Sequence, residues 1–403
     1  MRTDLGWRLR PDITYLTHGT YGACPESILE VQRAWRDRLE AEPVRFLTRE
    51  LDGLLDDTRA AVGSFLHADP EGLAFVPNAT TGVNTVLRSL RLEPGDELVA
   101  GNHEYNATIN ALRAVAEPAG AQVVVADIPL PVRGDEAVLD ALLAAVTPRT
   151  RLVLVSQVTS PTAIVFPVER LVRELAARGI DTLVDGAHAP GMLPIDLDAL
   201  GAAYWTGNGH KWLCAPKGAG VLWVREDRRD HVRPLVISHG ANESRTRRTR
   251  FRAEFDWTGT ADPTAILTLP AAIDWMAAQA PGGWPEVMAA NRALALRGRA
   301  IVEAALGVEP LAPDTMIGAM ATIAIPGVRT DDEAAALAGA VYEVDRFEVP
   351  IGGWPVPAAR SAPEAPPTAV LMRISAQRYN EVADYERLAS SLSARLGTTL
   401  AAE

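Results

Sequence analysis

Short apolar runs alternate with amphipathic stretches along the first two-thirds of the 403-residue chain. The apolar runs have the length of buried strands, and turn-forming residues bound them. We expect strands at 73–76, 97–100, 122–126, 152–157, 182–185, 202–206 and 220–224. Helical spacing marks the stretches between them, such as 80–90, 105–117, 138–145 and 167–178. Strands that alternate with helices predict right-handed βαβ crossovers and an α/β fold with a large, doubly wound, mostly parallel sheet.

The pattern changes after Gly259, where a long helical tract over 266–306 follows. Alternating β-like pieces and a final helix come next, at 319–325, 344–349, 371–374 and 381–396. This order indicates a separate, smaller α+β domain that the long helix connects to the first part of the chain. The Pro- and Ala-rich stretch 355–367 is expected to be a surface loop near the site.

These patterns divide the chain into an arm and two domains. Residues 1–14 form the N-terminal arm, residues 15–260 the large α/β domain, and residues 261–403 the small C-terminal domain. In an open α/β sheet, ligands bind beyond the carboxyl ends of the strands. The functional site is therefore expected at those ends of the large domain's strands.

Composition and charge narrow the class of protein. The chain is 48% hydrophobic and 22% charged, which is ordinary for a globular protein. Its net charge of −12 disfavours nucleic acid as a partner, because phosphate backbones need a basic face. No signal core or membrane span is visible, so we expect a cytoplasmic protein without a membrane partner. The two cysteines, Cys24 and Cys214, have no metal-site spacing, so no metal is expected.

One basic run, from Arg245 to Arg252, stands against the acidic net charge. A solvated loop is one interpretation of this run. The other is a loop that reaches an anionic substrate or the phosphate bound by a neighbouring subunit. The sequence alone leaves both interpretations open.

Two polar side chains at strand ends indicate the chemistry. The apolar run 181–185 ends in Asp185, and the run 202–206 leads into Lys211 between glycine-rich flanks. A pyridoxal 5'-phosphate (PLP) enzyme requires a lysine for the Schiff base and an acid that keeps the pyridine nitrogen protonated. This pair alone is equally consistent with a solvated lysine and a structural aspartate, so the other strand ends decide.

Three further strand ends suit the same cofactor. Thr80 lies where a strand passes into a helix, which favours a phosphate site, although an N-cap role is the alternative. His103 is expected to stack on the pyridine ring, with Tyr105 as the alternative and a buried structural histidine as the plain interpretation. A hydroxyl at Ser160 or Thr159 is expected to donate to the phenolic oxygen, unless the Ser-Pro pair only forms a turn.

Several motifs occur in a fixed order along nearly the whole chain. They are Leu-Thr-His-Gly-Thr-Tyr-Gly-Ala-Cys-Pro, Asn-Ala-Thr-Thr, His-Glu-Tyr-Asn-Ala, Thr-Ser-Pro-Thr, Asp-Gly-Ala-His-Ala-Pro, Gly-Asn-Gly-His-Lys-Trp-Leu-Cys-Ala-Pro-Lys-Gly-Ala-Gly and Leu-Met-Arg-Ile-Ser-Ala-Gln-Arg-Tyr-Asn. The set resembles the class V aminotransferase family of fold-type I PLP enzymes, and within it the isopenicillin N epimerase-like branch. The resemblance implies the fold-type I architecture, with PLP as cofactor and an obligate homodimer that shares its sites.

The resemblance implies roles for the matching positions. Lys211 would form the Schiff base, Asp185 would hold the pyridine nitrogen, and His103 would stack on the ring, so these three are the expected catalytic residues. His188 and Ser160 would lie near the phenolic oxygen. The implied phosphate-binding positions are Ala79, Thr80, His210, Asn208 (where many relatives have serine) and, toward the other subunit's phosphate, Thr260.

The substrate side of the site is implied as well. Arg373 matches the arginine that binds the substrate α-carboxylate, for which a guanidinium offers two N–H groups in a fixed fork. The N-terminal turn with His18 and Tyr21 is expected to close over the substrate and to set side-chain specificity. The implied partner is an amino-acid-like small molecule.

Two reactions remain open. We favour epimerisation at the Cα of an amino acid or amino-acid conjugate in specialised-metabolite, antibiotic-type biosynthesis. Epimerisation needs proton delivery on both faces: Lys211 serves one, and His103, Tyr105, Tyr21 or His18 the other. The alternative is a C–S lyase (β-elimination) or decarboxylating deaminase acting on a cysteine conjugate, as in lincosamide-type pathways, which needs only one face.

Two other functions are disfavoured. Cysteine desulfuration needs a mobile cysteine before the C-terminal arginine, and the loop 347–369 contains none. A non-catalytic binding protein on the same fold has no need for the intact set of Asp185, Lys211 and Arg373. An enzyme that uses PLP is therefore the prediction.

Overall fold

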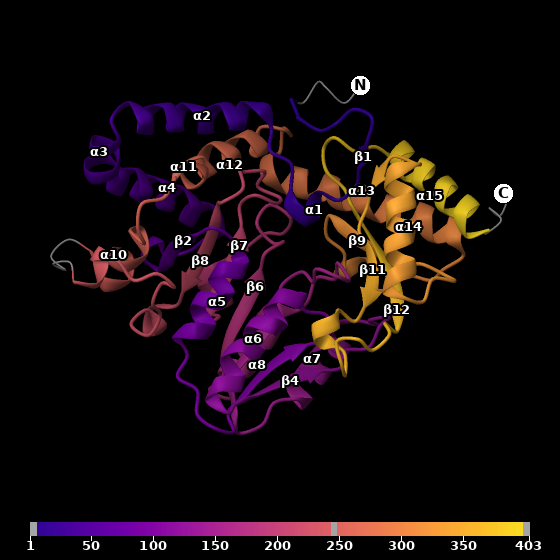
Figure 1. Cartoon of the computed structure of the whole chain (residues 1–403), viewed down its shortest axis with the longest axis horizontal. Helices are drawn as coiled ribbons and strands as arrows, with labels where there is room; N and C mark the ends of the chain where they lie inside the picture. The colour runs from indigo at the N-terminus through magenta and orange to yellow at the C-terminus, as the bar shows by residue number, and fades with distance from the viewer. Residues whose placement is uncertain (1–5, 243–247, 398–403) are drawn as a thin grey trace.

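A seven-stranded mixed sheet lies at the centre of the computed structural model, which describes residues 6–242 and 248–397 (Figure 1). The strand order is β2-β8-β7-β6-β5-β3-β4, with β8 antiparallel to both neighbours and the other pairs parallel. The strands are β2 (Leu73–Val76), β3 (Glu97–Gly101), β4 (Gln122–Ala126), β5 (Thr150–Ser156), β6 (Asp181–Gly186), β7 (Tyr204–Asn208) and β8 (Gly220–Val224). The expected α/β sheet is thus confirmed.

Helices bury both faces of this sheet. They are α5 (Ala79–Ser89), α6 (Asn106–Ala119), α7 (Asp135–Ala144) and α8 (Val168–Ala176). In β5, Leu152 and Leu154 pack with the apolar residues of α5 and α6. Val153 and Val155, which point to the other face, pack with those of α7 and α8. Because successive side chains of a strand alternate between faces, an unbroken apolar run fits a sheet covered on both sides.

The C-terminal part contains a second, antiparallel sheet in the order β11-β12-β9. Its strands are β9 (Met320–Ala324), β11 (Ile351–Trp354) and β12 (Ala369–Ser375), and its helices are α13 (Gly283–Leu306), α14 (Asp331–Glu343) and α15 (Val382–Leu396). The sequence reading missed β11 and α14. For α14 a signal existed, because Thr330 and Glu333 form a capping box at its start.

The long helical tract expected over 266–306 is not one helix. It is divided into α11 (Thr264–Leu267), α12 (Leu269–Ala277) and α13. Between α12 and α13, Pro281 offers no N–H group and Gly283 has a φ of 64°, so the helix cannot continue there. The continuous bridging helix was therefore a wrong prediction, although α13 still packs against the C-terminal sheet and α15.

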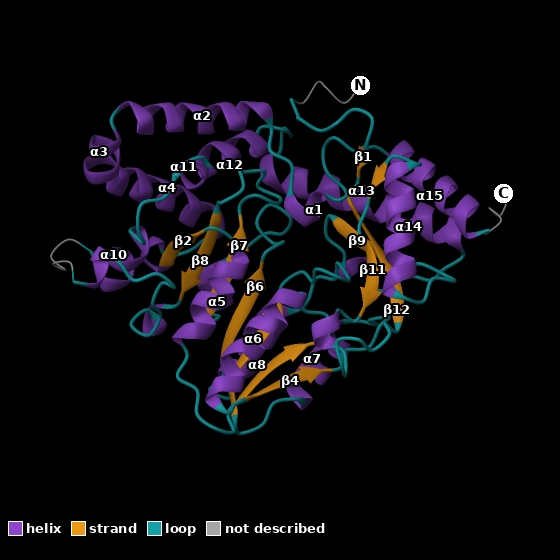
Figure 2. Cartoon of the chain, viewed as in Figure 1, coloured by secondary structure: helices purple, strands orange, loops and turns teal. Residues whose placement is uncertain are grey.

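The N-terminal segment crosses from the small sheet to the large one (Figure 2). Strand β1 (Thr14–Tyr15) pairs in parallel with β10 (Phe347–Glu348), and the short helix α1 (His18–Tyr21) follows it. In Figure 2, α1 lies between the two sheets, and helices α2 (Glu26–Ala41) and α4 (Leu51–Leu66) continue over the large one. The domain boundary at residue 260 stays a prediction.

The described part of the basic run is tied to neighbouring carboxylates. Arg245 and the two residues after it lie outside the described residues. Helix α10 (Arg250–Asp256) and the residues before it form a set of ion pairs with α4 and the turn before β2. We call this set the anchor cluster; its members are Arg59, Arg248, Arg252, Asp56, Asp256 and Glu71. Arg248 and Arg252 of the basic run therefore have a structural role, and the interpretation of the run as a solvated loop does not hold for them.

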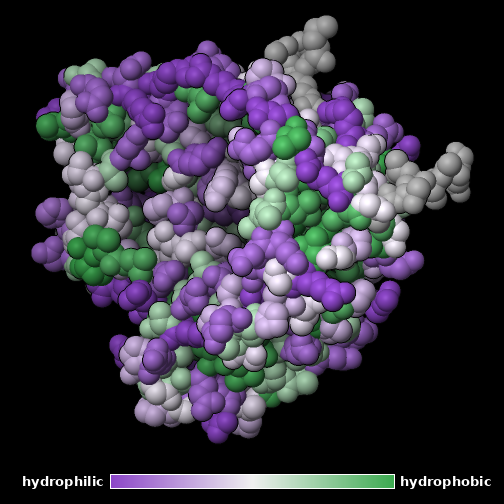
Figure 3. Space-filling view, turned by 45° about the vertical axis from the view of Figure 1, so that its right-hand side comes forward, coloured by the Kyte–Doolittle hydropathy of each residue, from purple (hydrophilic) through white to green (hydrophobic). Residues whose placement is uncertain are grey.

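The surface turned forward in Figure 3 is largely hydrophilic, with apolar residues in separate groups. Within residues 6–242 and 248–397, no helix is long and apolar enough to cross a membrane.

Candidate active site

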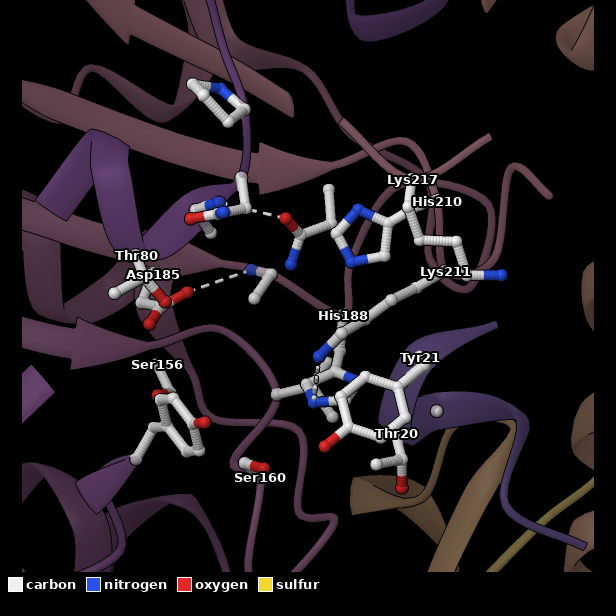
Figure 4. Close-up of a pocket in the computed structure, with 18 of the residues that line it drawn as sticks. Thr20, Tyr21, Thr80, Ser156, Ser160, Asp185, His188, His210, Lys211 and Lys217 are labelled. Carbon is white, nitrogen blue, oxygen red and sulfur yellow. Dashed lines mark hydrogen bonds between the residues drawn. The ribbon is translucent and has the colours of Figure 1, made fainter. Parts of the chain in front are cut away.

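A cavity of about 380 Å³ opens beyond the carboxyl ends of the parallel strands (Figure 4). Its floor comes from the end of β6, the turn after β7 and the start of α5, and β12 of the small sheet closes one side. The sequence-predicted residues that line it are Ala79, Thr80, Ser160, Asp185, His188, Asn208, His210, Lys211, Arg373 and Tyr21. The fold therefore brings together ten side chains from six separate motifs.

Lys211 lines this cavity as a half-buried residue, beside a histidine. Its Nζ lies 3.1 Å from His188 Nε2. Figure 4 marks this contact with a dashed line. Burial lowers the pKa of Lys211 to about 7, the charge of Arg373 acts in the same direction, and Asp185 opposes it. Burial also lowers the pKa of His188 well below its usual value, so this imidazole is neutral. An amine with this pKa is partly unprotonated at neutral pH and can act as a nucleophile or base.

Asp185 lies at the carboxyl end of β6, and its carboxylate accepts two hydrogen bonds from the described chain. Oδ1 accepts a hydrogen bond from the Ala187 N–H at 2.9 Å, and Oδ2 accepts a long one of 3.4 Å from Thr108 Oγ1. Burial raises the pKa of Asp185, while the Ala187 N–H and the charge of Lys211 work against that rise. A cationic partner is what such a carboxyl group needs to stay ionised.

The start of α5 is fixed against the end of β7. The Ala79 N–H donates to Asn208 Oδ1 at 2.8 Å, and the Asn78 side chain caps the helix through the Thr81 N–H at 2.9 Å. Gly82 allows this contact, because a Cβ there would lie 2.1 Å from Thr206 Oγ1 of β7. Asn208 therefore takes part by holding the helix start at the cavity wall, where an anion is favoured.

Three buried nitrogen atoms among the cavity residues have no hydrogen-bond partner within the described chain. They are His188 Nδ1, His210 Nδ1 and Arg373 Nε. Buried polar atoms without partners are rare and costly, so the cavity suits a ligand that brings oxygen acceptors. PLP carries a phosphate and a phenolic oxygen, and an amino-acid substrate adds a carboxylate. The residues present therefore fit this cofactor.

Arg373 connects the small sheet to the cavity. Its Nη1 donates to Ser160 O at 2.5 Å and to Ser160 Oγ at 3.1 Å, and its Nη2 donates to Thr20 Oγ1 at 2.7 Å. Burial lowers the pKa of Arg373 to about 10. The Ser160 hydroxyl, expected at the phenolic oxygen, thus contacts Arg373, and the sequence reading missed Thr20 although it lies between His18 and Tyr21.

His103 was predicted to stack on the cofactor, and the structure places it outside the cavity lining. Its Nδ1 lies 2.8 Å from Thr162 Oγ1 and its Nε2 lies 3.2 Å from Ile128 O, so both ring nitrogens have partners. The ring packs against Trp354 at 5.0 Å, and burial lowers its pKa to about 4. Tyr105 lines the cavity instead. The expected ring-stacking and catalytic role of His103 is therefore corrected.

Two more predicted residues lie outside the cavity lining. His18 is buried, and its Nε2 lies 3.0 Å from the main-chain oxygen of Lys211, so its expected direct substrate contact is corrected. Thr260 is exposed and does not line the cavity of its own chain.

The sequence reading also missed Glu104, which is buried behind Ser156 of the cavity lining. Its carboxyl group accepts hydrogen bonds from the Ser156 N–H at 2.9 Å and from the Ser156 hydroxyl. Burial raises the pKa of Glu104 to about 8, and the charge of Asp185 adds to that rise. Ser156 is paired with Asp185 in the sheet register, so Glu104 lies close to the Asp185 carboxylate. The Glu104 carboxyl group is therefore neutral near pH 7.

The fold and this site define a PLP-dependent enzyme of the class V aminotransferase family. The family profile described as "Aminotransferase class-V" matches residues 26–388, and the chain belongs to this family. Among curated relatives, the chain is 34% identical to the isopenicillin N epimerase of Amycolatopsis lactamdurans over 95% of both chains. It is 33% identical to that of Streptomyces clavuligerus over 96% of both.

Relatives with another activity match as well. The chain is 28% identical to a probable chloroplastic L-cysteine desulfhydrase of Arabidopsis thaliana, over 95% of this chain and 83% of that protein. Among solved structures, the cystine C–S lyase C-DES, in complex with its product cysteine persulfide, has a TM-score of 0.75 at 22% identity, covering 95% and 98% of the two chains. The cysteine desulfurase CsdA from Escherichia coli has a TM-score of 0.75 at 22% identity, covering 97% and 96%. These structures share the fold.

Proposed function

We propose that this enzyme is an epimerase that inverts the Cα centre of an amino acid or amino-acid conjugate, in an antibiotic-type biosynthetic pathway. The observation that carries the proposal is the Lys211 amine, which lies in the cavity 3.1 Å from His188 Nε2 and has a pKa of about 7, with Arg373 lining the same cavity. Similarity to two isopenicillin N epimerases over almost the full length supports the same reaction.

Each residue of the cavity has a separate role toward the cofactor in this proposal. Bound PLP supplies an electron sink for the charge left at Cα when a proton is removed. We assign Asp185 to hold the proton on the ring nitrogen, because burial makes a cationic partner favourable. We assign Ala79, Thr80 and His210 to the phosphate, and the unpartnered His188 Nδ1 to an oxygen acceptor of the bound molecule.

Arg373 is suited to the substrate carboxylate by the donors it has left. A guanidinium has five N–H groups, and Ser160 and Thr20 accept from Nη1 and Nη2. Nε has no partner within the described chain, and Nη2 has a second hydrogen. A carboxylate bound by Nε and Nη2 would use the bidentate geometry that arginine favours.

Lys211 takes and returns a proton on its own face of Cα, and a second group must act on the other face. Of the four candidates that the sequence suggested, His18 and His103 do not line the cavity, whereas Tyr21 and Tyr105 do. Both tyrosines are open to the cavity, with 68% and 46% of their surfaces exposed. We propose that one of these phenols is the second acid.

A C–S lyase that eliminates a thiol from a cysteine conjugate is the second candidate. The cysteine desulfhydrase relatives favour it, and Lys211 alone serves that reaction. Desulfurase chemistry is not proposed, because burial raises the pKa of both Cys24 and Cys214, and the loop 347–369 contains no cysteine.

Incubation with a panel of amino acids and cysteine conjugates in heavy water distinguishes the reactions. The epimerase gives deuterium at Cα together with inverted configuration, measured by mass spectrometry and chiral chromatography. The lyase gives a keto acid and a free thiol without inversion. Exchange at Cα that retains configuration for every compound would refute the epimerase.

We also propose a cytoplasmic homodimer in which Thr260 reaches the partner's phosphate. Thr260 is exposed and lies outside its own chain's cavity, which is consistent with this role. Light scattering of wild type and cofactor affinity of Thr260→Val test it. A monomer with a complete, active site would contradict it.

A further inference from the structure

The segment from Tyr15 to Gly22 is bound on one side to the C-terminal sheet and the loop after it. Ser375 of β12 donates its N–H to Leu16 O at 2.7 Å and accepts the Gly19 N–H on its hydroxyl at 3.1 Å. The Asn380 side chain donates to Tyr15 O at 3.0 Å. This part of the chain therefore follows the position of β12, the strand that carries Arg373.

The opposite side of the same segment contacts the turn that carries Lys211. His18 Nε2 lies 3.0 Å from Lys211 O, and Lys217 Nζ donates to Gly22 O at 2.9 Å. Gly22 has a φ of 67°, and a Cβ there would lie 1.9 Å from His210 O. Main chain thus packs against main chain, with α1 between the two sheets (Figure 2).

The hydrogen-bond partners of His18 fix its tautomer. The Ala23 N–H, which can only donate, points to Nδ1 at 3.4 Å, and Tyr379 OH lies 2.8 Å from the same atom. Nδ1 is therefore the acceptor, and Nε2–H donates to Lys211 O, which can only accept. The Gln377 amide nitrogen, 3.3 Å from Nε2, donates instead to Cys214 Sγ. Burial lowers the pKa of His18 to about 3, so the ring keeps this neutral form.

The carbonyl of Lys211 closes the turn that presents the lysine. It also accepts the Cys214 N–H at 3.0 Å, and Cys214 has a φ of 60°, which is unusual for a residue other than glycine. Two donors from different parts of the chain therefore hold this carbonyl. Loss of the His18 donor leaves one side of the turn without its outer support.

We propose that His18 is a positioning residue for Lys211. Its imidazole contacts the Tyr379 hydroxyl with one nitrogen and donates to the main-chain oxygen of Lys211 with the other, so it links the C-terminal part of the chain to the turn that carries the lysine. It rests on the proposed function only in taking Lys211 as the cofactor-bearing lysine. The link keeps the Lys211 amine beside His188 while the same segment, through Thr20, keeps Arg373 at the cavity. This contact would be needed in an epimerase and in a lyase alike, because both reactions require Lys211 to be held in place.

A matched pair of variants separates the hydrogen bond from packing. The amide nitrogen of Gln reaches the position of Nε2, whereas that of Asn reaches only the position of Nδ1, so His18→Gln keeps the donor to Lys211 O and His18→Asn removes it. For each variant, cofactor affinity is measured by equilibrium dialysis. Borohydride trapping and peptide mapping give the fraction attached at Lys211, and the melting temperature of the cofactor-free protein reports the fold.

We expect His18→Asn to weaken cofactor affinity and lower kcat by about tenfold each, with KM unchanged, because a buried carbonyl loses one partner. His18→Gln should recover most of both. Equal affinity in His18→Asn and wild type overturns the proposal. Equal losses in both variants, accompanied by the same fall in melting temperature, also overturn it and show a packing role.

Tyr379→Phe provides a second test if neither His18 variant folds. It removes the hydroxyl that faces Nδ1 and leaves the aromatic packing in place. Weaker cofactor binding at an unchanged melting temperature supports the link, and unchanged binding overturns it. Wild-type protein that traps no cofactor at Lys211 would instead refute the proposed function.

Discussion

Two groups of basic side chains in this molecule differ in the number of carboxylates that face them. The anchor cluster joins three arginines to three acids at α10. The second group, which we call the cavity cluster, lines the active site and contains Lys211, Arg373, Lys217, His188, His210 and Asp185. Asp185 is the one carboxylic acid among the described residues of that lining.

The difference distinguishes a structural cluster from a binding site. Burial lowers the pKa of Arg59, but the charges of Asp256 and Asp56 act against that change. Every arginine of the anchor cluster has a carboxylate partner within the chain, so the cluster needs no ligand. Arg373 has hydroxyl and carbonyl partners and no acid partner in the described chain, and its Nε has no acceptor. An excess of positive charge with open donors is what a phosphate and a carboxylate would complete.

The largest expected effect is at Lys211. Lys211→Ala should abolish covalent attachment of the cofactor and lower turnover at least about 10³-fold, because both nucleophile and proton carrier are lost. Borohydride trapping with peptide mapping measures it. Lys217→Ala is the control, since Lys217 lines the same cavity but donates to Gly22 O, and it should still trap at Lys211. Trapping at Lys217 in the wild type would reverse the assignment.

Asp185→Asn should lower Cα proton exchange by about 10³-fold, since an amide does not hold the ring nitrogen's proton. Cofactor should still bind through its phosphate. Deuterium exchange, together with equilibrium dialysis, checks the two halves of this prediction. Wild-type exchange in the variant would show that the ring nitrogen is held elsewhere.

The anchor cluster should respond in stability and not in chemistry. Asp256→Asn leaves Arg59 and Arg248 without their shared carboxylate and should destabilise the fold by about 3 kcal/mol, because it breaks a buried pair. Cofactor affinity of the folded variant should be unchanged. Denaturant unfolding measures the loss, and Asp52→Asn, whose side chain is 73% exposed, should leave stability as it is. If the folded Asp256→Asn variant lost cofactor affinity, the anchor cluster would be part of the active site and the distinction between the two clusters would fail.

Arg373→Ala should raise KM for α-carboxylate substrates by roughly 10- to 100-fold, because a charge-assisted hydrogen-bonded pair contributes about 1.5–3 kcal/mol. Arg373→Lys should recover only part of this, since lysine keeps the charge without the fork. Steady-state kinetics on a small amino-acid panel decides it. An unchanged KM with intact cofactor binding would place the carboxylate elsewhere or mean that the substrate has none.

The smallest effect is expected at Glu104, the buried acid that contacts Ser156. Its pKa is about 8 in the folded protein and above the unfolded value, so the folded state holds the extra proton. The stability it contributes is full below about pH 4.5 and is lost as pH rises through 8. Wild type should lose stability on the order of 1 kcal/mol between pH 7 and pH 8 through this group, and Glu104→Gln should not show that loss. Identical profiles for wild type and variant would show that Glu104 is ionised.

The sequence by itself determined the strand-and-helix order of the large sheet and the residues at its strand ends. Asp185 and Lys211 could be predicted because short, unbroken apolar runs locate buried parallel strands, whose carboxyl ends meet at one edge. Arg373 could be predicted only through resemblance, since β12 lies far away in sequence. Strand β11 has the sequence Ile-Gly-Gly-Trp, which carries almost no strand signal, so only pairing with β12 makes it a strand.

The tertiary structure decided which of the neighbouring side chains reach the cavity. His103 and Tyr105 lie two residues apart, yet packing against Trp354 and a bond to Ile128 O turn the histidine away, and Tyr105 faces the opening. The orientation of the His18 ring likewise depends on Lys211 O and Tyr379 OH, which lie 193 and 361 residues away in the sequence. Side-chain direction after a strand or in a short turn depends on such remote contacts, and no local pattern encodes them.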